Sequence, residues 1–160
     1  MSTEEGANSD AAAAKIDLAA LARIVAEAIP FSKALGLTLG DAGPGWAELS
    51  VPYDARLVGD PDTGVLHGGV VTALLDSCCG TAVLLHPDRP AATATIDLRI
   101  DYMRASDPGS GLIARARCYH TTRHVAFVRA VAFDRSEEDP VAMASGAFTV
   151  ENRGKEGLQP

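Results

Sequence analysis

Residues 66–85 read LHGGVVTALLDSCCGTAVLL, and this stretch decides the fold. It has the length of a helix of about five turns, which His86-Pro87 would end. After the opening histidine its only polar side chains are Thr72, Asp76, Ser77 and Thr81. A helix that is apolar all round is expected to be buried on every side. A membrane span would need roughly 20 uninterrupted apolar residues, and the glycines and the central aspartate argue against one.

The residues after this helix change to a period of two, which is typical of strands. Between residues 92 and 102 the even positions carry Ala, Ile, Leu or Tyr, and the odd positions carry Thr, Asp or Arg. This alternation predicts a long strand with one face in water. Three more strands are expected over 111–121, 124–134 and 141–150, and the short turns between them make neighbouring strands antiparallel.

The residues before the helix predict smaller elements. The apolar spacing over Asp17–Ile29 indicates an amphipathic helix that Pro30 ends. Strands are expected around 37–39 and over 46–53, followed by a loop over 54–66. With a disordered tail over 1–14 and a second tail over 152–160, residues 15–151 form one domain. The predicted fold class is α+β, a long antiparallel β-sheet wrapped around one central apolar helix.

Composition narrows the possible partners and compartments. The chain has 160 residues and a net charge of −7, which makes nucleic acid or an anionic membrane an unfavourable partner. The three cysteines include no Cys-x-x-Cys pair, so neither a disulfide framework nor a metal site is expected. The N-terminal residues lack the pattern of a signal peptide, which favours the cytoplasm.

The charge is unevenly distributed. Residues 99–135 contain seven arginines and three aspartates, a local charge of +4. Such a zone could bind a small anionic ligand, or it could be a solvated face of the sheet. The sequence leaves both interpretations open.

The start of the central helix, His67-Gly68-Gly69, is a candidate site for an anion or an oxyanion. Glycines leave backbone N–H groups accessible, and the helix dipole adds partial positive charge there. Asp76 is the second candidate, because a carboxylate in an apolar helix costs several kcal/mol unless it is paired or hydrogen-bonded. It is either a functional group or a structural one, bonded to a hydroxyl such as that of Thr72 or to a helix end in a partner subunit.

Distance limits how these groups can cooperate. Gly68 and Asp76 are eight residues apart, about 12 Å along a helix, so one substrate carbonyl cannot touch both in one chain. A catalytic site therefore predicts a homodimer whose two sites are shared across a two-fold axis. The rival nucleophiles, Cys78 or Cys79 with a histidine, are disfavoured because a thiol in an apolar helix has a raised pKa.

Three motifs resemble those of the hotdog-fold acyl-CoA thioesterases, in particular the phenylacetic-acid-degradation (PaaI-like) group. They are LHGGVV at 66–71, Asp76 two turns later, and TIDLRIDYMR at 95–104. The resemblance covers about residues 31–150 and the order of elements. It implies hydrolysis of an acyl-CoA to a free acid and CoA, without a cofactor or metal, by a homodimer or homotetramer.

The resemblance also implies a role for each matching residue. The Gly68 N–H would polarise the thioester carbonyl, and Asp76 of the facing subunit would be the nucleophile or the general base. His67 would orient the loop, and Thr95 would help position the attacking water. The implied CoA contacts are Gly69, Asp97, Tyr102, Met103, Arg104, Ala105, Thr122, Arg123 and His124, with Arg104 and Arg123 at the phosphates or the pantetheine arm.

Two positions depart from the family's pattern. Pro61 stands where relatives often carry an asparagine or glutamine, and Gly80 stands where some relatives carry a threonine. Two other functions remain possible on the same fold: a non-catalytic acyl-CoA sensor, and a dehydratase acting on acyl thioesters. The spacing from His-Gly-Gly to the aspartate disfavours the dehydratase.

Overall fold

The structure, a computed structural model, describes residues 17, 20, 24, 28–88 and 90–151. Six strands form one antiparallel sheet in the order β1-β2-β6-β7-β8-β5, so β1 and β5 are its edges. The strands are β1 (Thr38–Gly43), β2 (Trp46–Val51), β5 (Thr95–Tyr102), β6 (Leu112–Thr121), β7 (Val125–Phe133) and β8 (Ala142–Thr149).

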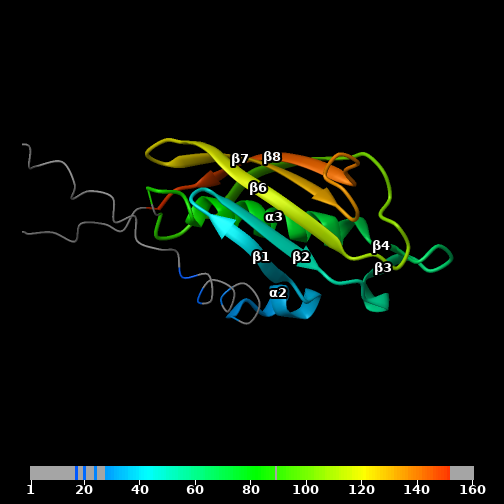
Figure 1. Cartoon of the computed structure of the whole chain (residues 1–160). Coiled ribbons are helices and arrows are strands. Elements are labelled where there is room, and N and C mark those ends of the chain that lie inside the picture. Colours follow the sequence, from blue (N-terminus) through cyan, green and yellow to red (C-terminus); the bar gives the residue numbers. More distant parts are fainter. Residues whose placement is uncertain (1–16, 18–19, 21–23, 25–27, 89, 152–160) are drawn as a thin grey trace, which may run out of the picture.

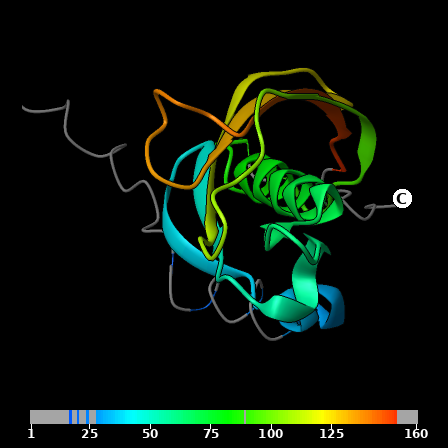
Figure 2. The ribbon, with the colours of Figure 1, turned by 90° about the vertical axis from the view of Figure 1, so that its right-hand side faces the viewer.

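One long helix, α3 (Gly68–Leu84), lies against the inner face of this sheet, which curves around it (Figures 1 and 2). Alternate side chains of each strand point toward the helix, as the period of a strand requires. Leu49, Leu112 and Val128 from the sheet and Leu74 and Leu75 from α3 are completely or almost completely buried between the two layers. Each such side chain stabilises the fold by about 2 kcal/mol. The predicted architecture, one antiparallel sheet around one apolar helix, is confirmed.

Some predicted details before α3 were wrong. Pro30 begins a helix, α2 (Pro30–Leu35), because its fixed φ and missing N–H suit the first helical position. The loop predicted over 54–66 contains the 3-10 turn η2 (Ala55–Leu57) and a small hairpin of β3 (Val58–Asp60) and β4 (Val65–Leu66). The helix predicted over 17–29 and the two tails lie largely outside the described residues.

A buried ion pair fastens the loop after β5 to the end of β7. The Asp134 side chain has no exposed surface, and it accepts hydrogen bonds from Arg104 Nη1 at 3.0 Å and from the Asp107 N–H at 2.7 Å. The Arg104 guanidinium holds the pKa of this carboxyl at about 2. Arg104 also donates to the carbonyls of Ala105 and Asp139. Both terminal nitrogens of Arg104 are therefore used inside the fold.

Asp134→Asn is expected to lower the free energy of unfolding by about 3 kcal/mol at neutral pH, because it leaves the Arg104 charge without its buried partner. The folded-state pKa of Asp134 is depressed, so the pair stabilises the protein above the unfolded pKa of 3.8 and this contribution is lost as the pH falls toward about 2. Urea unfolding followed by circular dichroism should show the difference from wild type shrinking over that range. Glu137→Gln, in a half-exposed pair with Arg115, is the control and should change stability by less than about 1 kcal/mol.

Candidate active site

The first turn of α3 presents a free backbone donor. His67 is the N-cap, and its Nδ1 accepts a hydrogen bond from the Gly69 N–H at 2.9 Å. This bond stabilises the turn that leads into α3. The next N–H, that of Val70, is bonded to the His67 carbonyl. The Gly68 N–H has no acceptor within the part of the chain that the structure describes. It therefore remains available, at the positive end of the helix, for a carbonyl oxygen or an anion.

The end of β5 holds the Gly68 peptide in place. Tyr102 Oη donates to the Gly68 carbonyl at 2.9 Å and lies 2.7 Å from Thr72 Oγ1. Tyr102 was predicted only as a CoA contact. Its bond to Gly68 adds a positioning role that no local sequence pattern indicates, because the two residues are far apart in the chain.

Asp76 lies in the middle of α3, and its carboxylate is held by the beginning of β5. Thr95 Oγ1 donates to Asp76 Oδ1 at 2.7 Å. The suggestion of Thr72 as the hydroxyl partner was therefore wrong. Asp76 is only half-buried and Thr72 is exposed, so the prediction that α3 is buried on every side was wrong as well. The helix keeps one stripe open to its surroundings.

A β-bulge brings Thr95 to Asp76. Thr95 lies opposite Phe148 of β8, whereas Asp97 lies opposite the adjacent Ala147, so Ile96 is an extra residue in β5. A bulge shifts the alternation of side chains by one position. The simple alternation placed Thr95 on the same face of the strand as Asp97, which was wrong, although Thr95 is exposed in the single chain. Thr95 faces α3 on the same side of the sheet as Phe148.

The candidate residues divide between the two ends of β5. Thr95 and Asp76 lie at its beginning, while Tyr102 and Gly68 lie at its end. The predicted CoA contacts divide in the same way. Asp97 and the turn Thr122-Arg123-His124 are near the end of β8, whereas residues 102–105 are at the opposite end. One chain therefore does not bring Gly68 and Asp76 to a common point.

The strand that carries both half-sites is an exposed edge. Ile96 and Tyr102, together with Met103 just beyond the strand, are 56%, 52% and 55% exposed, respectively. An edge strand presents unpaired N–H and C=O groups to its surroundings. With large apolar side chains beside those groups, β5 has the character of a strand that pairs with another chain.

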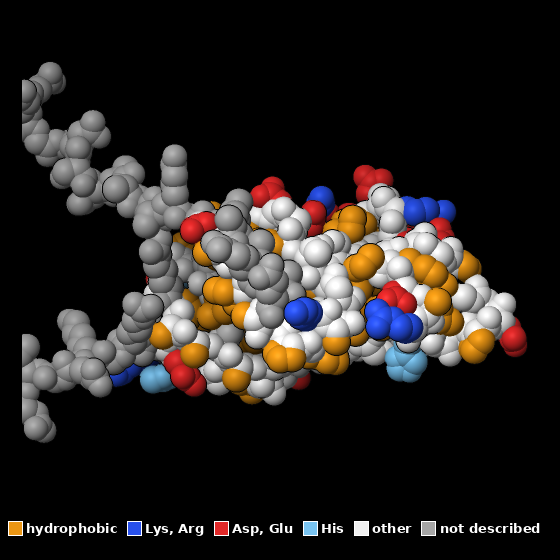
Figure 3. All heavy atoms as spheres, turned by 90° about the horizontal axis from the view of Figure 1, so that it is seen from below, with side chains coloured by type: hydrophobic (Ala, Val, Ile, Leu, Met, Phe, Trp, Pro, Cys, Tyr) orange, Lys and Arg blue, Asp and Glu red, His pale blue; other side chains and the backbone are white. Residues whose placement is uncertain are grey.

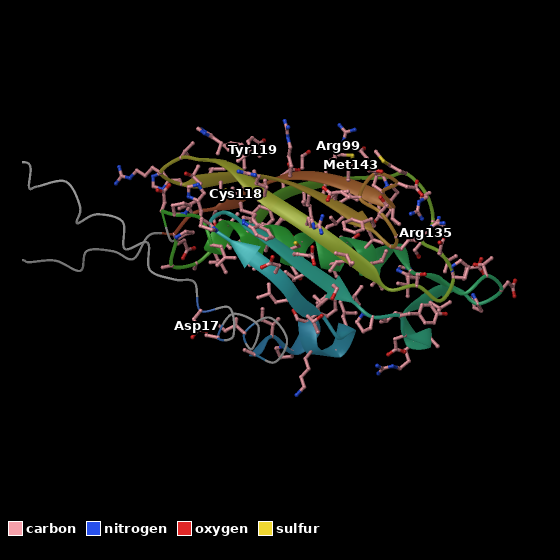
Figure 4. The ribbon with its side chains drawn as sticks, in the orientation of Figure 1. Asp17, Arg99, Cys118, Tyr119, Arg135 and Met143 are labelled. Carbon is pink, nitrogen blue, oxygen red and sulfur yellow. The ribbon has the colours of Figure 1, made fainter. Side chains whose placement is uncertain are left out.

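The arginine-rich stretch does not form one site in the single chain. Four of its seven arginines have acidic partners: Arg99 with Asp101, Arg104 with Asp134, Arg115 with Glu48 and Glu137, and Arg135 with Asp107. Figure 4 places Arg99, Tyr119 and Met143 on the outer face of the sheet, away from α3. The face seen in Figure 3 likewise intermixes both charges with hydrophobic side chains. These partners support the interpretation as a solvated sheet face for the paired arginines.

Arg104 requires a correction. It was predicted at the phosphates or the pantetheine arm of CoA, but Asp134 and two carbonyls take its donors. Arg123 is in the exposed turn between β6 and β7. Of the two arginines singled out, only Arg123 is placed to meet a ligand at the surface.

The cysteines have the properties of core residues. Burial raises the pKa of the Cys78 thiol to about 12, and it also raises that of Cys79. Cys78 Sγ donates to the carbonyls of Ala47 and Ala114 at 3.3 Å. Nucleophilic attack needs the thiolate, so neither cysteine is a candidate nucleophile.

Other kinds of site find little support in the described ranges. No group of three or more His, Cys, Asp or Glu side chains there could hold a metal ion, and no helix there is long and apolar enough to cross a membrane. Two surface hollows, of about 420 and 370 Å³, have neither Gly68 nor Asp76 in their walls. The larger one lies on the outer face of the sheet. The chemistry-bearing residues are thus on an open face beside β5.

Comparison with known proteins places this arrangement in a family. The sequence pattern of the thioesterase superfamily matches residues 63–141. The medium/long-chain acyl-CoA thioesterase YigI of Salmonella typhimurium is 31% identical over 136 residues, which are 76% of this chain and 84% of YigI. YigI of Escherichia coli is 30% identical over 137 residues, 76% of this chain and 86% of the relative.

Solved structures agree with this assignment. A crystal structure of a Pseudomonas aeruginosa protein has a TM-score of 0.73 at 35% identity and covers 82% of this chain and 98% of its own. The PaaI protein of E. coli, from the phenylacetic acid degradation operon, has a TM-score of 0.69 at 21% identity, with 83% and 95% covered. PaaI thus shares the fold, as the resemblance implied. The chain belongs to the thioesterase superfamily, and its fold is the hotdog fold.

Proposed function

We propose that this protein hydrolyses acyl-CoA thioesters to a carboxylic acid and CoA at sites shared by two copies of the chain. The observation that carries the proposal is the division of the site along the exposed edge strand β5. Its first residue, Thr95, holds the Asp76 carboxylate at 2.7 Å, and its last residue, Tyr102, holds the Gly68 peptide at 2.9 Å.

Antiparallel pairing of β5 with β5 of a second copy completes both sites. A two-fold axis at the middle of β5 would bring the beginning of the strand in one chain close to the end of the strand in the other, because the strands of such a ladder run in opposite directions. Asp76 of one chain would then approach Gly68 of the other, at both ends of the paired strands. We propose a homodimer of this kind, which could assemble further into a dimer of dimers.

Each group then has a chemical task. The Gly68 N–H donates to the thioester oxygen and stabilises the negative charge that forms there. Asp76 removes a proton from the attacking water or itself attacks the carbonyl carbon, and the Thr95 hydroxyl orients its carboxylate and helps position the water. When water attacks, its oxygen bonds to the carbonyl carbon, the carbon–sulfur bond breaks, and the CoA thiolate that leaves takes up the proton that Asp76 removed. When Asp76 attacks, the departure of CoA leaves an acyl–Asp76 anhydride, which water then hydrolyses to the free acid and the Asp76 carboxylate. His67 keeps the loop before Gly68 in place through its bond to Gly69.

We propose that CoA lies across the junction of the two chains. One chain would contribute Asp97 and the turn Thr122-Arg123-His124, with Arg123 at a phosphate. The other would contribute Gly69, Tyr102, Met103 and Ala105, while Arg104 supports that loop from inside. The name of YigI includes medium- and long-chain acyl-CoA, and we propose acyl groups of this kind for the present protein.

Thiol release from acetyl-, hexanoyl-, decanoyl- and palmitoyl-CoA tests the function directly. We expect one equivalent of free acid for each CoA released, with the protein's own three cysteines subtracted in a blank without substrate. Mass spectrometry of the acyl product separates the alternatives. Acyl-CoA that binds and stays intact would mean a sensor, and an enoyl or hydroxyacyl thioester would mean a dehydratase; either result would contradict the proposal.

A further inference from the structure

Gly80 stands out among the described glycines because the chain around it gives no reason for a glycine there. Four others have a positive φ, and at six more a Cβ would lie within 2.9 Å of a neighbouring atom. Only Gly68 and Gly80 escape both restrictions. A Cβ added at Gly68 would lie 3.6 Å from its nearest neighbour, a ring atom of Tyr102. A Cβ added at Gly80 would lie 3.9 Å from a ring atom of Phe148. Both distances are ordinary contacts, so an alanine would fit at either position.

Both of these glycines are in α3, where alanine would be preferred. Glycine inside a helix lowers helix stability because it loses more backbone freedom on folding. At Gly68 the choice of glycine is explained by the proposed function and not by the fold of one chain, because the Gly68 N–H faces the proposed carbonyl site. Gly80 lies twelve residues further along the same helix. Since the described residues around it do not require a glycine, the choice of glycine at this position also needs an explanation outside the single chain.

Gly80 belongs to the same patch as the Asp76 carboxylate. It follows Asp76 by one helical turn, and Leu84 follows it by one more. These three positions form a stripe along α3 in which Asp76 and Gly80 are half-buried and Leu84 is exposed. The fully buried Cys79 and Val83 lie beside it. Phe148, the neighbour of Gly80, is the strand partner of Thr95, which binds Asp76.

We propose that Gly80 leaves room for the acyl chain of the substrate, which runs along α3 from Asp76 past Gly80 to Leu84. This inference rests on the proposed hydrolysis of acyl-CoA. Beyond Asp76 this path passes the backbone of Gly80, beside the edge of the largely buried Phe148, and ends at the aliphatic side chain of Leu84, which is 38% exposed. An unbranched hydrocarbon chain matches these surfaces.

The length of the path sets the class of acyl group. Asp76 and Leu84 are eight residues apart, about 12 Å along the helix, which an extended chain of roughly nine carbons would span. The acyl groups that use this path are therefore linear and of medium length. An acetyl group would end before it reaches Gly80.

A series of side chains at position 80 tests this path. Gly80→Val should lower kcat/KM for decanoyl-CoA at least about tenfold and leave kcat/KM for acetyl-CoA within about twofold of wild type. Gly80→Ala should have a smaller effect of the same kind and raise the Tm, because its methyl group fits the helix. Ala73→Val is the matched control: it creates the same valine side chain, with two added carbons in place of three, at a half-buried position of α3 on the other side of Asp76. It should not change the ratio between the two substrates.

Sedimentation of each variant separates the path from a contact between subunits. A loss confined to long acyl groups, with the oligomeric state unchanged, supports the inference. An equal loss with both substrates, a changed oligomeric state in Gly80→Val, or no change with any substrate overturns it. A wild-type protein that releases thiol from none of the esters would refute the proposed function itself, so the two failures are distinguishable.

Discussion

Asp76→Asn is expected to lower kcat/KM for acyl-CoA hydrolysis about a thousandfold, within the range of a positioned proton acceptor. The asparagine oxygen can still accept the hydrogen bond from Thr95, which is 2.7 Å from Asp76 Oδ1, so the helix and β5 should keep their contact. The amide neither takes a proton from water nor attacks a carbonyl carbon. Initial rates of thiol release with decanoyl-CoA would measure the loss, and circular dichroism would confirm that the fold is retained.

Asp101→Asn is the matched control for this change. Asp101 is also in the region of β5, but its carboxylate is more than half exposed and pairs with Arg99 on the outer face. The control should keep a rate close to that of wild type. Comparable turnover in the two variants would remove Asp76 from the reaction and leave it a structural partner of Thr95.

Gly68→Pro is expected to lower kcat/KM by about two to three orders of magnitude, as the loss of one oxyanion donor does. Proline deletes the N–H and is favoured at the first position of a helix, where Gly68 stands. The preceding residue, His67, already has an extended backbone, with φ −63° and ψ 137°, as a residue before proline requires. Gly68→Ala keeps the N–H, places its methyl group 3.6 Å from Tyr102, and should retain most of the activity.

Mixing the two inactive variants tests whether the sites are shared. In a hybrid dimer of Asp76→Asn and Gly68→Pro, one site would combine the intact Gly68 of the first chain with the intact Asp76 of the second. Random reassortment makes half of the dimers hybrid, so about a quarter of the wild-type activity should return. Recovery should require subunit exchange, for example by refolding the mixture. An inactive mixture with proven hybrid dimers would show that each chain supplies a complete site by itself.

The sequence predicted the layers of the fold because its patterns are local. The apolar run over α3 and the alternating strands after it are each legible within about ten residues. The helix α2 that begins at Pro30 was missed because proline is compatible with both the end of one helix and the first turn of the next. The small hairpin of β3 and β4 sits in a segment rich in turn residues, where short strands leave no periodic signal.

The site was predicted in outline and corrected in its contacts. The helix start and the carboxylate at Asp76 were legible from the sequence because glycine and aspartate are unusual in an apolar helix. Their partners were not, since Thr95 reaches Asp76 only through the bulge at Ile96, and Tyr102, at the far end of β5, meets Gly68 although the two are 34 positions apart in the sequence. Arg104 looked available in the sequence, and its use by Asp134 depends on how two distant loops meet.

The open edge of β5 also has a consequence for how activity depends on protein concentration. A chain whose β5 edge is unpaired contains every proposed catalytic group, but its own Gly68 and Asp76 are too far apart to act on one substrate. On dilution, both the number of chains and the fraction in the proposed dimer would decrease, so the rate of the proposed hydrolysis would fall more steeply than the protein concentration. The specific activity of the enzyme would thus report the affinity between its subunits, and the level of expression would act on the rate through assembly as well as through amount.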